Sequence, residues 1–119
     1  MIKSIAFTVY PVTEMARSRS FYEGVLGLTP GYCYGDKWVE YDLGDSTFAI
    51  TTTDMGHTPG AMGAIVAFEV EDMDAFVSSL KEKSVTFVID TFSTPVCRIA
   101  AIADPDGNHI SIHKRNEGR

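Results

Sequence analysis

The sequence is poor in cysteine and has no excess of basic residues. Cys33 and Cys97 are the two cysteines among 119 residues, and two thiolates cannot complete a four-ligand structural zinc site. Ten Lys and Arg residues stand against 16 Asp and Glu residues, which gives a net charge of −6. A nucleic-acid-binding domain needs a clustered basic surface. We therefore expect no structural zinc and no nucleic-acid partner.

Long apolar runs are also missing. No stretch approaches the ~18 apolar residues of a membrane span, and the first residues lack the basic-then-apolar pattern of a secretory signal. Hydrophobic residues make up 45% of the chain and charged residues 22%, which is typical of a globular domain with its own core. These features predict a cytoplasmic protein with both thiols reduced and without a membrane segment. They also predict a single domain over 1–119.

A repeat with a period of 58 residues organises the chain. The segments "FTVYPVTEM" (7–15) and "IVAFEVEDM" (65–73) align without a gap, and each leads into a helical pattern. Glu14 and Asp72 are placed as helix N-caps or first-turn acids. The apolar positions predict two buried helix stripes, Ala16, Phe21, Val25 and Leu28 in the first and Met73, Phe76, Val77 and Leu80 in the second.

Short strands follow each helix. The segments 38–44 and 47–52 are joined by the turn "LGDS", and 98–104 and 109–114 by the turn "DPDGN". A Gly- and Pro-containing linker (54–63) separates the two halves. The pattern predicts an α+β fold with two tandem βαβββ modules, at about 3–53 and 64–114. Their curled mixed sheets would surround a concave cavity.

Alternation along the strands separates two faces. One set of residues is apolar and should lie beneath the helices: Val39, Tyr41, Leu43, Phe48, Ile50, Val66, Phe68, Val70, Ile110 and Ile112. The other set either lines the cavity or is a solvated surface: Trp38, Glu40, Asp42, Thr47, Ala49, Thr51, Ile65, Ala67, Glu69, His109, Ser111 and His113.

The segment "DPDGNHISIH" (104–113) contains two histidines in the metal-binding spacing H-x-x-x-H. That spacing chelates an ion on a helix, where residues four apart are neighbours. On a strand, His109 and His113 are ~13 Å apart at about 3.3 Å per residue, whereas each must come within ~2.1 Å of a shared ion. The preceding turn and the alternating isoleucines indicate a strand, so these two histidines cannot bind one metal ion together.

Two segments resemble the glyoxalase/bleomycin-resistance/extradiol-dioxygenase superfamily, also called the vicinal oxygen chelate family. The segment "VTEMARSRSFYEGVLGL" (12–28) is similar to its first helix, and "DPDGNHISI" (104–112) to its closing turn and last strand. The likeness covers about 3–114. It implies the tandem βαβββ fold around a cavity, and a homodimer in which modules can be exchanged between chains.

Metal-dependent members of this family hold an ion through one residue on each of four strands. The resemblance places these positions at Phe7, Ala49, Ile65 and Ser111. Three of them have no donor atom, and serine is a poor ligand for a divalent ion. The sequence therefore predicts the metal-free type, with no metal and no cofactor, and it argues against the family's metal-dependent lyase and dioxygenase activities.

The first functional hypothesis is a binding protein that holds a small planar or aromatic compound, for sequestration or resistance. Phe7 and Trp38 would stack on the ligand with help from Tyr41 or Tyr34, and the acidic residues of this face would meet a cation. The candidate ligand-binding residues are Phe7, Trp38, Glu40, Ala49, Thr51, Ile65, Ser111 and His113.

The alternative is a lyase, isomerase or dioxygenase of the same superfamily. In a metal-free enzyme, His113 would be the acid or base, since histidine titrates near neutral pH, and Glu69 would be the partner carboxylate. A displaced metal site built from His113, Glu69 and Glu40 is the remaining possibility. For each catalytic candidate, a purely structural role in the strand is the competing interpretation.

Overall fold

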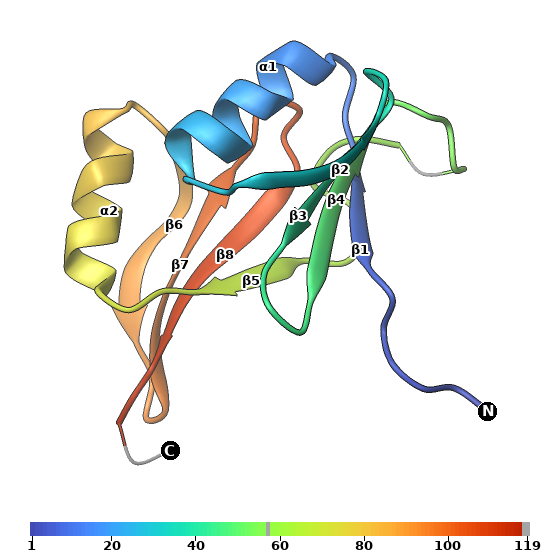
Figure 1. Ribbon diagram of the computed structural model, residues 1–119. Coiled ribbons are helices and arrows are strands. Elements are labelled where there is room, and N and C mark those ends of the chain that lie inside the picture. Colours follow the sequence, from blue (N-terminus) through green and yellow to red (C-terminus); the bar gives the residue numbers. More distant parts are fainter. Residues whose placement is uncertain (57, 118–119) are drawn as a thin grey trace. The chain divides into compact units, whose positions relative to one another are not determined.

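The computed structural model describes residues 1–56 and 58–117. The chain divides into two compact units, Met1–Pro59 and Gly60–Arg119, and this boundary falls inside the predicted linker. Each unit contains one four-stranded sheet and its helix (Figure 1). The predicted α+β fold of two tandem βαβββ modules is confirmed.

The first unit contains β1 (Thr8–Pro11), α1 (Met15–Arg19), a π-helical continuation η1 (Ser20–Val25), β2 (Pro30–Tyr34), β3 (Trp38–Asp42) and β4 (Thr47–Thr51). The strand order is β1-β4-β3-β2. β1 is parallel to β4, and the other pairs are antiparallel. A parallel β1–β4 pair requires a long crossover, which the helix and the two later strands provide. Residues 1–7 precede β1 as an irregular segment (Figure 1).

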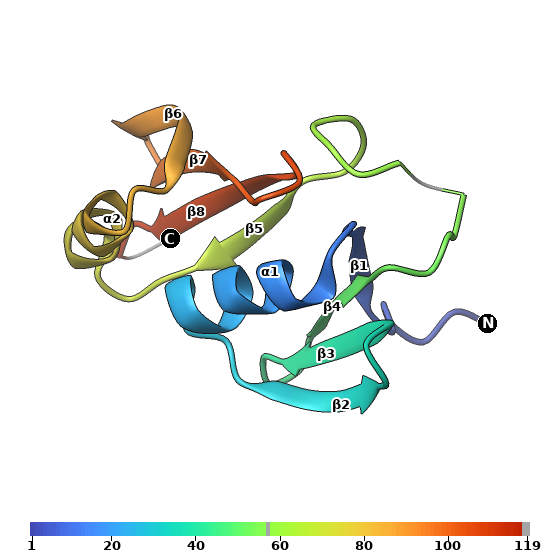
Figure 2. The ribbon, with the colours of Figure 1, turned by 90° about the horizontal axis from the view of Figure 1, so that it is seen from above.

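The helix of the first unit packs on the apolar face of its sheet, as the alternation predicts (Figure 2). Tyr22 lies with its ring centroid 6.2 Å from that of Tyr41 and 5.3 Å from that of Phe48. Val39 and Ile50 on the same face are fully buried. These aromatic and branched side chains form the core that fixes β3 and β4 beneath the helix.

The predicted stripe of the first helix is only partly correct. Ala16 is exposed, and Val25 and Leu28 are half-buried. The buried positions are Met15, Ser18, Phe21, Tyr22 and Leu26. The helix changes to π geometry after residue 19, with the amide of Leu26 bonded to the carbonyl of Phe21 five residues earlier. The wider π turn shifts the later part of the buried stripe away from the positions that a 3.6-residue period predicts. Ala16 precedes it, in α1, and lies on the exposed side of a regular helix.

The second unit repeats this order with β5 (Val66–Glu69), α2 (Met73–Glu82), β6 (Thr86–Ser93), β7 (Cys97–Ala103) and β8 (His109–Arg115). Its sheet has the order β5-β8-β7-β6, with β5 parallel to β8. Asp72 is the N-cap of α2 and accepts a hydrogen bond from the Ala75 amide at 3.0 Å, as predicted. Of the predicted stripe, Met73, Val77 and Leu80 are buried and Phe76 is half-buried.

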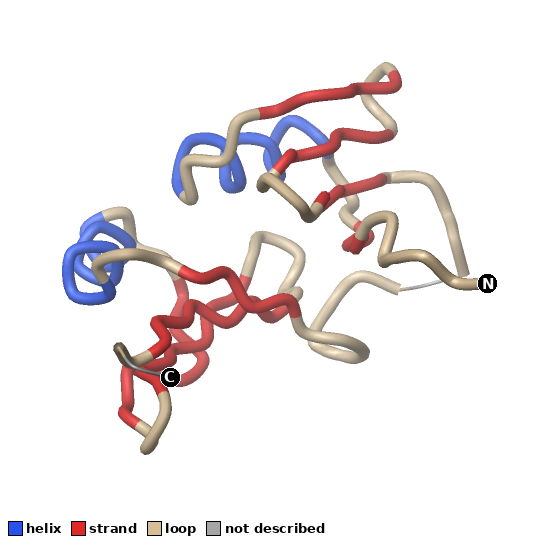
Figure 3. Tube along the Cα trace, turned by 60° about the horizontal axis from the view of Figure 1, so that its bottom comes forward, coloured by secondary structure: helices blue, strands red, loops and turns tan. Residues whose placement is uncertain are grey.

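The turn before β8 is held by buried polar groups. Asp104 accepts hydrogen bonds from the amides of Asp106 and Asn108 and from Nδ2 of Asn108. Oδ1 of Asn108 accepts the Gly60 amide at 2.8 Å. The turn is therefore bonded to the long loop that joins β4 to β5, at Gly60 (Figure 3), and β8 begins directly after it.

β8 confirms the strand interpretation of the two histidines. His109 and His113 lie at different rungs of one strand, so they are too far apart for one ion. In the part of the chain that the structure describes, no helix is long and apolar enough to cross a membrane.

Candidate functional site

The candidate site of the second unit lies on the face of its sheet opposite α2, here called the far face. The helix side is marked by the buried Ile110 and Ile112 and by the ion pair between Arg98 and Asp74 of α2 at 2.8 Å. Strand alternation therefore directs His109, Ser111 and His113 to the far face. Sequence reasoning grouped these three residues correctly.

A small apolar groove occupies the far face. Its volume is about 150 Å³, and a cavity of about that size holds one benzene-sized ring. Its lining is Ile65, Val88, Ile89, Phe92, Ile99, Ala100, Ala101, His109 and Ser111. Two of the predicted ligand-binding residues, Ile65 and Ser111, thus line the same groove. Sequence reasoning missed the contribution of β6, because β6 was not identified as a strand.

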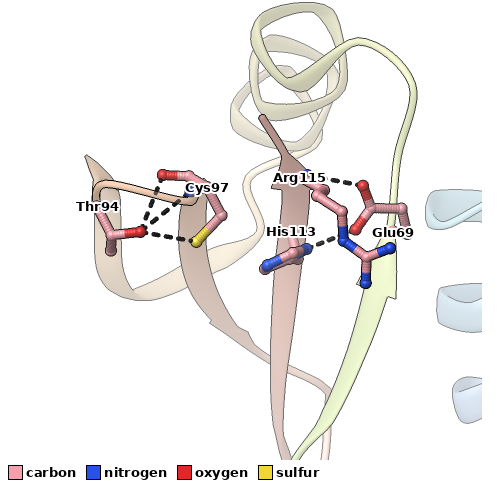
Figure 4. Close-up of polar contacts among 5 residues, drawn as sticks. All are labelled: Glu69, Thr94, Cys97, His113 and Arg115. Carbon is pink, nitrogen blue, oxygen red and sulfur yellow. Dashed lines mark hydrogen bonds and ion pairs between the residues drawn. The ribbon is translucent and has the colours of Figure 1, made fainter. Parts of the chain in front are cut away.

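His113 and Glu69, the two predicted catalytic residues, are brought together by the parallel pairing of β5 and β8. Nδ1 of His113 lies 2.5 Å from Oε1 of Glu69, and Oε2 of Glu69 accepts the Arg115 amide at 2.7 Å (Figure 4). The Arg115 amide, followed by His113, lowers the pKa of Glu69. The carboxylate is therefore ionised and fixed at both oxygens, which makes it a partner that can orient an imidazole.

Cys97 lies on the far face beside Ile99 but is buried. Its Sγ is 3.1 Å from Oγ1 of Thr94 (Figure 4). The same oxygen accepts the amides of Val96 at 3.2 Å and Cys97 at 3.1 Å. The Thr94 hydroxyl thereby stabilises the β6–β7 turn. Cys97, the first residue of β7, is part of this hydrogen-bonded turn.

In the first unit, Phe7 and Trp38 form an aromatic pair on the face opposite the helix. Their ring centroids are 5.2 Å apart in an edge-to-face arrangement, and Trp38 donates its indole N–H to Oε2 of Glu40 at 2.9 Å. Phe7 is 40% exposed. Tyr34 pairs with Trp38 across β2 and β3 and is also exposed. These four predicted side chains therefore share one face.

The prediction that Tyr41 could stack on a ligand is wrong. Tyr41 is fully buried beneath the helix and donates its hydroxyl to Oε2 of Glu23 at 3.0 Å. Burial, followed by the bond to Glu23, raises the pKa of Tyr41. Its position two residues from Val39 on the same strand already placed it on the helix side.

Ala49 and Thr51 lie on the far side of β4 but are 0% and 2% exposed. The Thr51 hydroxyl donates to the Lys37 carbonyl at 2.7 Å and accepts the Thr53 amide at 3.0 Å. In this structure these two predicted ligand-binding residues present almost no accessible atoms, and the hydroxyl of Thr51 holds the β2–β3 connection.

The four positions at which the family binds metal do not fit a divalent ion. Phe7 and Ala49 in the first unit and Ile65 in the second have no donor atom, and Ser111 offers one hydroxyl. Among residues 1–56 and 58–117, no three His, Cys, Asp or Glu side chains come together as a ligand set. Glu69 and His113 supply two donors, one fewer than a protein metal site requires.

Residues 4–112 match the model of the Glyoxalase/Bleomycin resistance protein/Dioxygenase superfamily, and the chain belongs to this superfamily. A search of curated proteins found no match to the sequence.

Solved structures agree on the fold. The chain is similar to TnmS3, an antibiotic binding protein from Streptomyces sp. CB03234 (TM-score 0.83, 23% identity, 97% of this chain and 98% of that one). It is also similar to lactoylglutathione lyase from Agrobacterium tumefaciens (0.74, 18%, 96% and 95%) and to the fosfomycin resistance protein FosX from Mesorhizobium loti (0.74, 16%, 98% and 96%). The TM-scores and coverages establish a shared fold, whereas sequence identities below 25% do not carry a ligand over to this chain.

Proposed function

We propose that this protein binds a small aromatic compound in the groove of the second sheet without the help of a metal ion. The groove itself carries the proposal: its lining is mostly aliphatic and aromatic, with His109 and Ser111 as polar residues. Small-molecule sites typically combine such an apolar surface with a few polar groups that orient the ligand.

The donor-poor family positions support the metal-free part of the proposal. Ile65 and Ser111 occupy two of those positions and line the groove, so apolar contact and one hydroxyl stand where a metalloenzyme has ligands. Among the similar structures, TnmS3 is described as an antibiotic binding protein. We propose the same class of function here, binding of a small molecule, with sequestration or resistance as its outcome.

In the first unit, we propose that the Phe7–Trp38 pair is a separate surface on which a planar ligand can stack. The exposed ring of Phe7 and the half-buried indole of Trp38 offer stacking surface. The Glu40 carboxylate, held by the indole N–H, would favour a ligand with a cationic group.

A thermal-shift screen of single-ring aromatic compounds tests the proposal on chelator-treated protein. Ala101 lies in the groove between Ile89 and Ser111, so Ala101→Leu should fill it and abolish the shift of any hit. Ala75→Leu is the matched control, because Ala75 is exposed on α2. Hits that stabilise Ala101→Leu as much as Ala75→Leu would exclude the groove as the site.

We also propose that the chain forms a homodimer, as the family resemblance implies. Light scattering coupled to size exclusion should report twice the mass of the chain. A monomer mass at all concentrations would reject this proposal without affecting the groove.

A further inference from the structure

His113 is the next far-face residue of β8 after Ser111 and is the cross-strand neighbour of a groove residue, Ile99. It pairs with Ile99 across β7 and β8, and Ile99 pairs with Phe92 of β6; both apolar residues line the groove. Directly paired residues on one face of a sheet have Cβ atoms about 4.5–5.5 Å apart. The His113 side chain is 21% exposed; it is not part of the groove lining, but its ring is partly accessible beside Ile99.

The contact with Glu69 decides which ring nitrogen carries the proton. The carboxylate is an acceptor, and its pKa is lowered by the Arg115 amide and by His113 itself. The 2.5 Å contact therefore needs a proton on Nδ1 of His113. In the neutral imidazole, the lone pair is then on Nε2, and Figure 4 shows the side of the ring that carries it directed away from Glu69.

We propose that His113 accepts a proton from a weakly acidic hydroxyl, a phenol or an enol, of a ligand whose ring occupies the groove. This inference rests on the proposed function and narrows its ligand class. The ligand O–H bond breaks, its proton is transferred to Nε2, and the electron pair stays on the ligand oxygen. The resulting imidazolium keeps its Nδ1–H bond to Glu69, which acts as a positioning residue.

The other charged and titratable groups around the ring are compatible with this transfer. Glu69 from β5 stabilises the imidazolium, and Arg115 further along β8 lies close enough to help lower the pKa of Glu69. Cys97 is the titratable neighbour on β7. Lys114 and Arg98 are cross-strand neighbours on the opposite, helix-facing side of the sheet. Arg98 forms an ion pair there with Asp74 of α2.

Two matched probes test the proposal. 4-Nitrophenol has an acidic hydroxyl and changes colour when it ionises, whereas 4-nitroanisole has the same ring with the hydroxyl methylated. The wild type should bind 4-nitrophenol about tenfold more tightly than 4-nitroanisole, since a charge-assisted hydrogen bond is among the stronger ones. Bound 4-nitrophenol should show the phenolate band at a lower pH than the free compound.

In His113→Gln, the ratio of the two affinities should fall to about one, and the phenolate band should return to the pH at which the free compound ionises. Lys114→Gln is the control, because it changes the next residue of β8 on the opposite face; it should retain the wild-type ratio. In Glu69→Gln, the phenolate band should move to higher pH, because the imidazolium loses its carboxylate partner.

The outcomes separate the two proposals. If both probes bind with equal affinity, or if His113→Gln keeps the wild-type ratio and band, the proton-acceptor role is wrong and the groove still binds aromatic rings. If neither probe binds to the wild type, the groove proposal fails and the inference fails with it.

Discussion

Replacing Asp104 with alanine should destabilise the second unit by about 3 kcal/mol. The Asp104 side chain, 5% exposed, accepts the amides of Asp106 and Asn108 and the Nδ2 group of Asn108 at 2.8–2.9 Å. Both Asn108 donors are buried. A buried donor left without a partner costs about 1–3 kcal/mol, so these two donors give about 2–6 kcal/mol. The Asp106 amide belongs to a half-buried residue and is not counted, and the expectation of about 3 kcal/mol lies within that range.

Urea unfolding measures this loss. For an m-value of about 1.5 kcal/mol/M, within the usual span for a small protein, 3 kcal/mol corresponds to a midpoint lowered by about 2 M. Asp45→Ala is the matched control, since Asp45 is exposed in the equivalent turn of the first unit; it should change stability by no more than about 0.5 kcal/mol. Equal midpoints for the two variants would refute the assigned role of the Asp104 network.

Three further predictions concern charge and metal. Glu69 has a lowered pKa in the folded state, so its ionised form stabilises the fold at pH values above the ordinary pKa of 4.5. This stability is lost as the pH falls through the lowered pKa, and the melting temperature of Glu69→Gln should therefore depend less on pH in the acid range. Tyr41 has a raised pKa in the folded state, so its neutral form stabilises the fold at pH values below the ordinary pKa of 10.0, and this stability is lost as the pH rises above it. Tyr41→Phe should remove this loss of stability at alkaline pH and should cost about 1 kcal/mol at neutral pH, because the hydrogen bond to Glu23 is lost. Added Zn²⁺, Ni²⁺ or Mn²⁺ should leave the melting temperature unchanged, because a bound ion would raise it; a saturable rise would count against a metal-free site.

Most of the fold could be predicted from local patterns. The alternation in β3, β4 and β8 and the two hairpin turns lie within about ten residues of sequence each, and together with the 58-residue repeat they indicated the module order and most of the buried face. Leu43, which was assigned to that face, is exposed. The first helix departed from its predicted stripe at Ala16 in α1 and again at Val25 and Leu28, at the end of and just after the π-helical segment. Strand alternation assigned Tyr41 to the helix face, whereas its aromatic ring suggested stacking on a ligand. The structure buries Tyr41 completely, so the assignment from alternation is correct.

The site was harder to predict because its contacts are not local. Glu69 and His113 are 44 residues apart and meet through the register of the parallel pair β5–β8. Sequence alternation places each on the far face but does not say which rung each occupies. The β6 wall of the groove, with Ile89 and Phe92, depends on a strand whose pairing with β7 contains register shifts, and these interrupt the alternation that would have revealed it.

The central claim is that the groove of the second sheet binds an aromatic ring without a metal ion. Isothermal titration of chelator-treated protein with 4-nitroanisole tests it most directly, because this probe depends on the apolar groove and not on proton transfer. Saturable binding by the wild type that is lost in Ala101→Leu and retained in Ala75→Leu is the expected result. No binding by the wild type, or equal binding by both variants, would contradict the claim.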